Sequence, residues 1–193
     1  MKYADILKKT SFNKEELLAF AYGTLSDDIP QDTGRLPIPP MLMVDRITEI
    51  SREQNNSFLI AERDVRVDDW FFHCHFLGDP VQPGCLGVDA VWQLLGFFCV
   101  VSGAQGTGRA LGCKEVNFSG QIRPHNKVVR YEIKIRRYQV KPSDGTAVVI
   151  GSGKVFVDDE LIYEIENAKV GTFSGIKYGN YPLPGPNSKG GAN

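Results

Sequence analysis

The chain has 193 residues, 42% of them hydrophobic, which is enough to form the core of one compact domain. Its 22 Lys and Arg residues balance 23 Asp and Glu residues, so no strong overall field attracts nucleic acid. Residues 1–9 lack the apolar run of a secretory signal, and the four cysteines have no CxxC spacing. We therefore expect a cytoplasmic protein without disulfides.

The N-terminal third predicts one short helix and two strands. Asn13 followed by Glu16 is typical of a helix start, and Gly23 is typical of a helix end. Residues 24–40 are rich in Asp, Pro and Gly and predict a loop. Strands are expected over residues 41–50 and 58–64.

A second helix is predicted over residues 85–101, which are apolar on all sides except at Asp89 and Gln93. A helix that is hydrophobic all round is buried in a protein core or in a membrane. The run approaches the roughly 20 residues that a membrane span needs, but it contains an acid, lacks basic flanks and lies among predicted strands. We therefore expect a buried helix and no membrane insertion.

The C-terminal half predicts an antiparallel sheet. Apolar and polar residues alternate over residues 127–140, and the pattern continues over 146–157 and 161–173. The short polar turn at 158–160 predicts a hairpin between the last two strands. We expect one domain over residues 1–173 and a loosely ordered tail over 174–193.

Candidate catalytic residues gather just before and within the apolar helix. His75 has aromatic neighbours, and an imidazole in such a setting tends to stay neutral and can act as a base. Asp89 is an acid in a helix where an unused carboxylate is costly to bury. The backbone N–H groups of Gly84 and Cys85, at the start of the helix, can stabilise an oxyanion.

Other interpretations of these residues remain open. His75 alone is typical of a satisfied core histidine, and Asp89 can simply complement the helix dipole. A zinc site from His73, Cys74, His75 and Cys85 is disfavoured, because consecutive residues of an extended segment point to opposite faces and no HExxH or paired CxxC motif is present. Cys85 as a nucleophile is also weakly supported, since a packed thiol would look the same.

The segment from Trp70 to Gln93 resembles the active-site region of bacterial 3-hydroxydecanoyl acyl carrier protein dehydratases. It contains the long pattern WFF-x-CHF-x-GDPV-x-PGCLG-x-DA-x-WQ. The similarity extends from residues 14–18 through 41–46, 109–112 and 161–163 to 169–171. This resemblance implies an α+β hot-dog fold, in which a curved antiparallel sheet wraps a long central helix.

The resemblance also implies an activity and an assembly. The activity is dehydration of (3R)-3-hydroxyacyl groups on acyl carrier protein to trans-2-enoyl groups in fatty-acid synthesis. Isomerisation of a medium-chain, ten-carbon product from trans-2 to cis-3 is a further expectation, and no metal or organic cofactor is required. The resemblance implies a homodimer in which His75 of one subunit and Asp89 of the other are the catalytic pair.

Acyl carrier protein is strongly acidic, so a basic docking patch is expected. The candidate residues for this patch are Arg136, Arg137, Lys141 and Lys169. An ordinary strand face exposed to solvent explains the same four residues equally well. The sequence departs from the family pattern at His73, where a small residue is common, and in an insertion-like loop at residues 141–145, expected to lie away from the chemistry.

Two alternative functions follow from the same fold. One is an acyl thioesterase, which hydrolyses the thioester rather than eliminating water. The other is a non-catalytic acyl-binding subunit of a larger synthase. The presence of both His75 and Asp89 favours the dehydratase.

Overall fold

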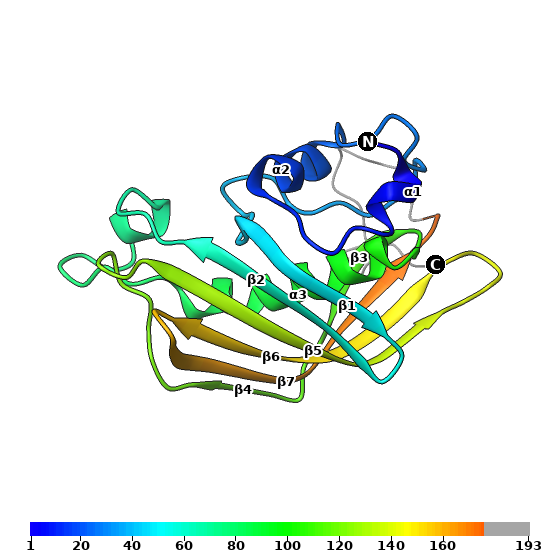
Figure 1. Cartoon of the computed structure of the whole chain (residues 1–193). Coiled ribbons are helices and arrows are strands. Elements are labelled where there is room, and N and C mark those ends of the chain that lie inside the picture. Colours follow the sequence, from blue (N-terminus) through cyan, green and yellow to red (C-terminus); the bar gives the residue numbers. More distant parts are fainter. Residues whose placement is uncertain (176–193) are drawn as a thin grey trace, which may run out of the picture.

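A seven-stranded antiparallel sheet curves around one long helix in the computed structural model, which describes residues 1–175 (Figure 1). The strand order is β1-β2-β5-β6-β7-β3, and β4 also pairs with β7. This arrangement confirms the fold predicted from the sequence. In chain order, the elements are α1 (Tyr3–Ile6), α2 (Lys14–Tyr22), β1 (Arg46–Glu53), β2 (Asn56–Asp64), the 3-10 helix η1 (Trp70–His73), α3 (Gly84–Val101), β3 (Thr107–Gly112), β4 (Glu115–Phe118), β5 (Val128–Val140), β6 (Ala147–Val157) and β7 (Glu160–Phe173).

Helix α2 has the predicted ends. The Asn13 side chain accepts a hydrogen bond from the backbone N–H of Glu16 at 2.9 Å, and the Glu16 side chain accepts one from the N–H of Asn13 at 3.0 Å. Gly23 ends the helix in the left-handed conformation, at a φ of 79°. These reciprocal bonds satisfy two backbone donors that would otherwise lack partners.

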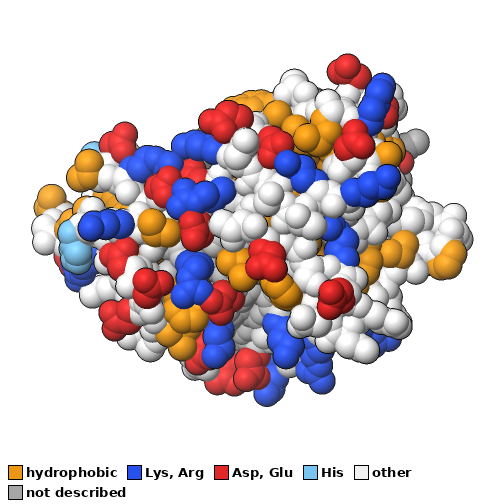
Figure 2. All heavy atoms as spheres, viewed as in Figure 1, with side chains coloured by type: hydrophobic (Ala, Val, Ile, Leu, Met, Phe, Trp, Pro, Cys, Tyr) orange, Lys and Arg blue, Asp and Glu red, His pale blue; other side chains and the backbone are white. Residues whose placement is uncertain are grey.

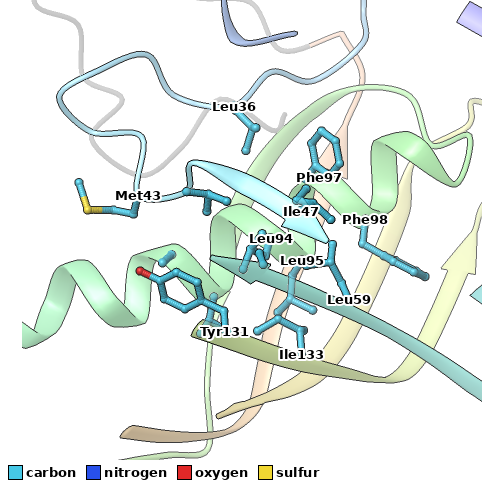
Figure 3. Close-up of a cluster of buried hydrophobic side chains, with 14 of the residues drawn as sticks. Leu36, Met43, Ile47, Leu59, Leu94, Leu95, Phe97, Phe98, Tyr131 and Ile133 are labelled. Atoms are coloured by element: carbon cyan, nitrogen blue, oxygen red, sulfur yellow. The ribbon is translucent and has the colours of Figure 1, made fainter. Parts of the chain in front are cut away.

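Helix α3 is the centre of the core. In Figure 3, Leu94 and Leu95 of α3 lie in one buried cluster with Leu59 of β2 and Ile133 of β5. The helix is long and apolar enough to cross a membrane, yet 67% of it is buried inside the folded chain. The sheet and the N-terminal segment together provide the apolar surroundings that its composition demands.

The hairpin between β6 and β7 forms where it was predicted. Val157 pairs with Glu160, and the two residues between them, Asp158 and Asp159, have positive φ angles of 48° and 69°. Positive φ at both central positions matches the right-handed twist of the flanking strands.

Three features differ from the sequence-based expectations or lie outside the structure described. The predicted strand over 41–50 begins later, at Arg46, because the backbone of Met41 and Met43 bonds to the Gln93 side chain instead of to a strand. Strands β3 and β4 were not predicted. Most of the predicted tail, residues 176–193, lies outside the described residues.

Asp45 connects α2 to the first two strands. Its carboxylate accepts a hydrogen bond from the N–H of Asp64 at 2.9 Å and forms ion pairs with Arg66 at 3.0 Å and Lys14 at 3.2 Å. Burial alone would raise the pKa of Asp45, but the Asp64 hydrogen bond and the two cations lower it overall.

We expect Asp45→Asn to lower the free energy of unfolding at pH 7 by about 1–3 kcal/mol, measured by denaturant titration. Because the folded-state pKa is depressed, the stabilisation is present above the unfolded pKa of roughly 3.9 and is lost as pH falls through the folded value. The difference from wild type should therefore shrink in acid. Asp159→Asn is a matched control, since that side chain is 92% exposed. An undiminished difference at pH 3 would contradict this account.

Candidate active site

His75 lies on the wall of a cavity at the start of α3. The cavity has a volume of about 610 Å³, which is in the range typical of ligand sites. We call it the His75 cavity. Its lining residues are His75, Val81, Gln82, Gly84, Cys85, Val88, Trp92, Val116, Phe118, Gly120, Gln121 and Tyr163.

The imidazole of His75 is fixed by the loop that follows it. The N–H of Val81 donates to the carbonyl of His75 at 2.8 Å, and the carbonyl of Val81 lies 2.9 Å from His75 Nδ1. A carbonyl oxygen only accepts, so Nδ1 must carry a proton. In the neutral ring, Nε2 is therefore the nitrogen that can accept a proton.

Gly84 and Cys85 line the same cavity at the first two positions of α3. Their N–H groups have no acceptor within the helix, because the first turn has no preceding carbonyls. Close packing explains the glycine, since a Cβ at Gly84 would lie 2.8 Å from the Phe118 ring. The predicted oxyanion donors thus share a cavity with His75.

Asp89 opens onto a different hollow. This hollow, which we call the Asp89 groove, has a volume of about 310 Å³. Its lining residues are Phe20, Gly34, Arg35, Leu36, Pro37, Met41, Asp89, Trp92, Gln93, Gly96, Phe97, Val100, Gly108, Arg109, Ala110, Val170 and Thr172.

The Gln93 side chain forms hydrogen bonds both with the Asp89 side chain and with the backbone of Met41 and Met43, which lies beside the groove. Its amide donates to Asp89 at 2.6 Å and to the carbonyl of Met41 at 2.9 Å, and its oxygen accepts from the N–H of Met43 at 3.1 Å. The sequence marked Gln93 as a polar residue in an apolar helix, and its spacing of four from Asp89 puts the two side chains on one face.

Within one chain the structure separates His75 from Asp89 into these two hollows. Trp92 lines both of them. Its indole N–H is buried and has no hydrogen-bond partner among residues 1–175. A single chain therefore holds the two predicted catalytic residues on neighbouring hollows that Trp92 divides.

A buried ion pair, which the sequence analysis missed, supports the segment before His75. Arg63 of β2 is 5% exposed and contacts Asp69 at 2.5 Å, and its guanidinium lies 5.3 Å from the centre of the Phe71 ring. Its position could have been inferred from the period of two, because Leu59, Ala61 and Arg63 fall on one face of the strand. Arg63 thus anchors η1, the turn that leads to His75.

His73 and Cys99 do not line the His75 cavity. His73 is exposed at the end of η1. Burial raises the pKa of the Cys99 thiol to about 12, so this cysteine stays protonated. Over residues 1–175, no three His, Cys, Asp or Glu side chains are grouped to hold a metal ion.

Three of the four predicted docking residues lie together. Arg136, Arg137 and Lys169 line a depression of about 650 Å³, where Lys114 joins them. Lys141 instead pairs with Asp144 at 2.8 Å in the loop between β5 and β6. That loop contacts Gln105, beyond the end of α3 opposite to His75.

Figure 2 shows how charge is distributed over one face of the molecule. Lys and Arg are interspersed with Asp and Glu, apolar side chains appear in several separate patches, and His side chains lie at the end that carries η1. Phe76 and Leu77, in the loop after His75, are among the exposed apolar residues.

The curved antiparallel sheet around one long helix is the hot-dog architecture, and a solved dehydratase complex shares it. The dehydratase heterocomplex ApeI:P from Xenorhabdus doucetiae matches with a TM-score of 0.59 and 14% identity, covering 76% of this chain and 93% of that one. A hypothetical thioesterase with coenzyme A from Streptococcus pneumoniae has a TM-score of 0.47 and 8% identity, covering 66% and 84%. At such identities the likeness concerns the fold alone.

The family follows from the sequence match. A family model for the FabA-like domain covers residues 36–166, which is most of the chain and includes His75, Gly84, Cys85 and Asp89. The chain belongs to the FabA-like domain family, within the hot-dog dehydratases.

We expect Arg63→Met to lower the free energy of unfolding by about 3–5 kcal/mol, because Asp69, whose side chain is 12% exposed, would lose its cation and keep only the N–H of Arg66 as a partner. Denaturant unfolding measures the loss, and adding Asp69→Leu should recover part of it. Arg123→Met is the control: it breaks a more exposed ion pair with Asp79 and should cost no more than about 1 kcal/mol. A loss of similar size in both single variants would contradict the anchoring role.

Proposed function

We propose that this protein is a cytoplasmic dehydratase that converts (3R)-3-hydroxyacyl groups on acyl carrier protein to trans-2-enoyl groups in fatty-acid synthesis. The observation that carries the proposal is the His75 cavity, where an imidazole with a fixed tautomer shares its wall with the N-terminus of α3. A base and an oxyanion site are the two requirements for removing a proton next to a thioester carbonyl.

The residues have complementary roles in this reaction. Nε2 of His75 takes the proton from the α-carbon while the N–H groups of Gly84 and Cys85 stabilise negative charge on the thioester oxygen. The C–H electron pair forms the new double bond as the bond to the 3-hydroxyl breaks. The Asp89 side chain gives the departing hydroxyl a proton, so that water leaves, and the proton taken up by His75 is passed on to restore the pair.

We further propose a homodimer with shared active sites. In one chain His75 and Asp89 open onto separate hollows, so a site that needs both is complete only if a second subunit brings one of them. Strand β3 supports such an assembly, because residues 107–111 are all exposed at one end of the strand order. An exposed edge strand readily pairs with another chain.

Isomerisation of a ten-carbon trans-2 product to cis-3 is part of the proposal. It requires only that the same pair move a proton from the γ-carbon to the α-carbon. The family motif over residues 70–93 supports it, and His73, which departs from the family pattern, is exposed and does not line the His75 cavity.

The test is incubation of the full chain with a 3-hydroxydecanoyl acyl carrier protein, with separation of hydroxy, trans-2, cis-3 and free-acid products. We expect enoyl products, and a fall in kcat/KM of about 10²–10⁴-fold in both His75→Ala and Asp89→Asn. His73→Ala is the neighbouring control and should retain dehydration. Free acid as the product would favour the thioesterase, and tight binding without turnover would favour an acyl-binding subunit.

Mixing the two inactive variants tests whether the site is shared. After subunit exchange, a mixed dimer holds one site with both His75 and Asp89 intact, so part of the activity should return. No recovery, despite exchange verified by mass spectrometry, would contradict a site between subunits.

The depression around Arg136, Arg137, Lys169 and Lys114 is the proposed docking surface for the acidic carrier protein. We expect Arg137→Glu to raise KM roughly tenfold for the carrier-linked substrate but not for the same acyl group on pantetheine, because only the carrier contacts this surface. Lys141→Glu, in the loop beyond the depression, is the charge-matched control. An equal rise in KM for both substrates would contradict the docking role.

A further inference from the structure

The Asp89 groove follows one face of α3. Asp89, Gln93, Gly96 and Val100 line it at intervals of three or four residues, which places them in one row on the helix. From Asp89 to Val100 the row is about 16 Å long at about 1.5 Å per residue. The hollow is therefore elongated, with a carboxylate at one end.

Apart from Asp89 and Gln93 near its beginning, the row along the helix is apolar. The segment over residues 34–41 forms one side of the groove. The carbonyl of Met41 accepts a hydrogen bond from Gln93, and a Cβ at Gly34 would lie 3.4 Å from Val100. Residues of β3 and β7 line the groove as well. Arg35 and Arg109 also line the groove, but the helix row beyond Gln93 gives it an apolar wall, which fits an unbranched hydrocarbon chain that leads away from the reacting carbons at Asp89.

Phe20 of α2 lines the part of this channel that is distant from Asp89, beside Phe97. It is 1% exposed, and its ring meets Phe97 edge to face at a centroid distance of 5.1 Å. Phe97 is eight residues, or about 12 Å, along α3 from Asp89. Phe20 also lies before residue 36, where the part covered by the FabA-like domain model begins.

The position of Phe20 is held by the rest of α2. Its carbonyl accepts a hydrogen bond from Arg35 at 3.3 Å, and Phe12 packs on Phe97 as well, at 5.0 Å. Phe12 does not line the groove, although it touches the same ring. The N-terminal segment therefore closes the channel with a fixed aromatic side chain.

We infer that Phe20 sets the upper limit of acyl-chain length, with the Asp89 groove as the subsite for a saturated, unbranched medium-length chain. The inference rests on the proposed function, since the dehydratase reaction places the thioester end of the substrate beside Asp89. An acyl chain that reaches Phe20 can lengthen only if that ring moves or is replaced.

Substitutions at two positions along the groove should shift the length preference in opposite directions. Phe20→Leu removes part of the closing ring, so longer chains should fit. Gly96→Leu adds a side chain midway, and the backbone tolerates it because a Cβ there meets its nearest atom, of Val170, at an ordinary 3.8 Å. Shorter chains should then be favoured.

The experiment measures kcat/KM of the full chain for 3-hydroxyacyl carrier protein substrates of eight, ten, twelve and fourteen carbons. We expect the ratio for fourteen over ten carbons to rise at least tenfold in Phe20→Leu, since a pocket discriminates one methylene by about 10–200-fold. Gly96→Leu should lower the ratio for ten over eight carbons by a similar factor. Phe12→Leu, which perturbs the same Phe97 without opening the channel, should leave the profile as in wild type.

Binding of non-reactive 3-hydroxyacyl-pantetheine amides by calorimetry separates the inference from the proposed function. Suppose that wild type turns over none of the substrates, but that the chain-length preference in binding shifts in both variants, relative to wild type, as described above. The dehydratase proposal then fails and the role of Phe20 stands. If turnover occurs but the profiles of Phe20→Leu and Gly96→Leu match wild type, the length limit lies elsewhere. A shift in Phe12→Leu equal to that in Phe20→Leu would also overturn the inference.

Discussion

Helix α3 must be covered on nearly every side, and most of the structure follows from that requirement. On the sheet side, β6 approaches closely because Gly153 and Gly151 have no side chains: a Cβ at either would lie within 3.0 Å of Val91 or Leu95. On another side, Phe12 and Phe20 bring the N-terminal segment onto Phe97. Burial of this apolar surface is the main source of stability in such a fold.

The proposed dehydration uses the face of α3 that the rest of the chain leaves partly exposed. Asp89, Trp92 and Gly96 are only partly buried, and they follow one face of the helix. The side chain of Gln93, on the same face, forms hydrogen bonds with Asp89 and with the backbone of Met41 and Met43. The contacts with β6 and the partly buried residues of the groove lie on different faces of the helix, whereas Phe97 belongs both to the core and to the groove wall.

Periodicity and capping predicted the long helix, α2 and the main strands, because each of these signals is local to the element. The start of β1 was placed too early because the bonds of Met41 and Met43 to Gln93 come from a residue about fifty positions away. Strand β3 was missed because residues 107–111 are all exposed and show no alternation. The residue types of the candidate site were predictable, whereas the division of His75 and Asp89 between two hollows depends on tertiary packing.

The bond from His75 Nδ1 to the carbonyl of Val81 has a consequence for how this site tolerates mutation. Its acceptor is a main-chain atom, which every amino acid provides, so a substitution at position 81 does not delete the partner. A histidine oriented by a carboxylate side chain would lose its tautomer with one such change. Here the tautomer of the imidazole depends on the position of the Val81 carbonyl, so it changes only if the backbone of the loop changes its conformation.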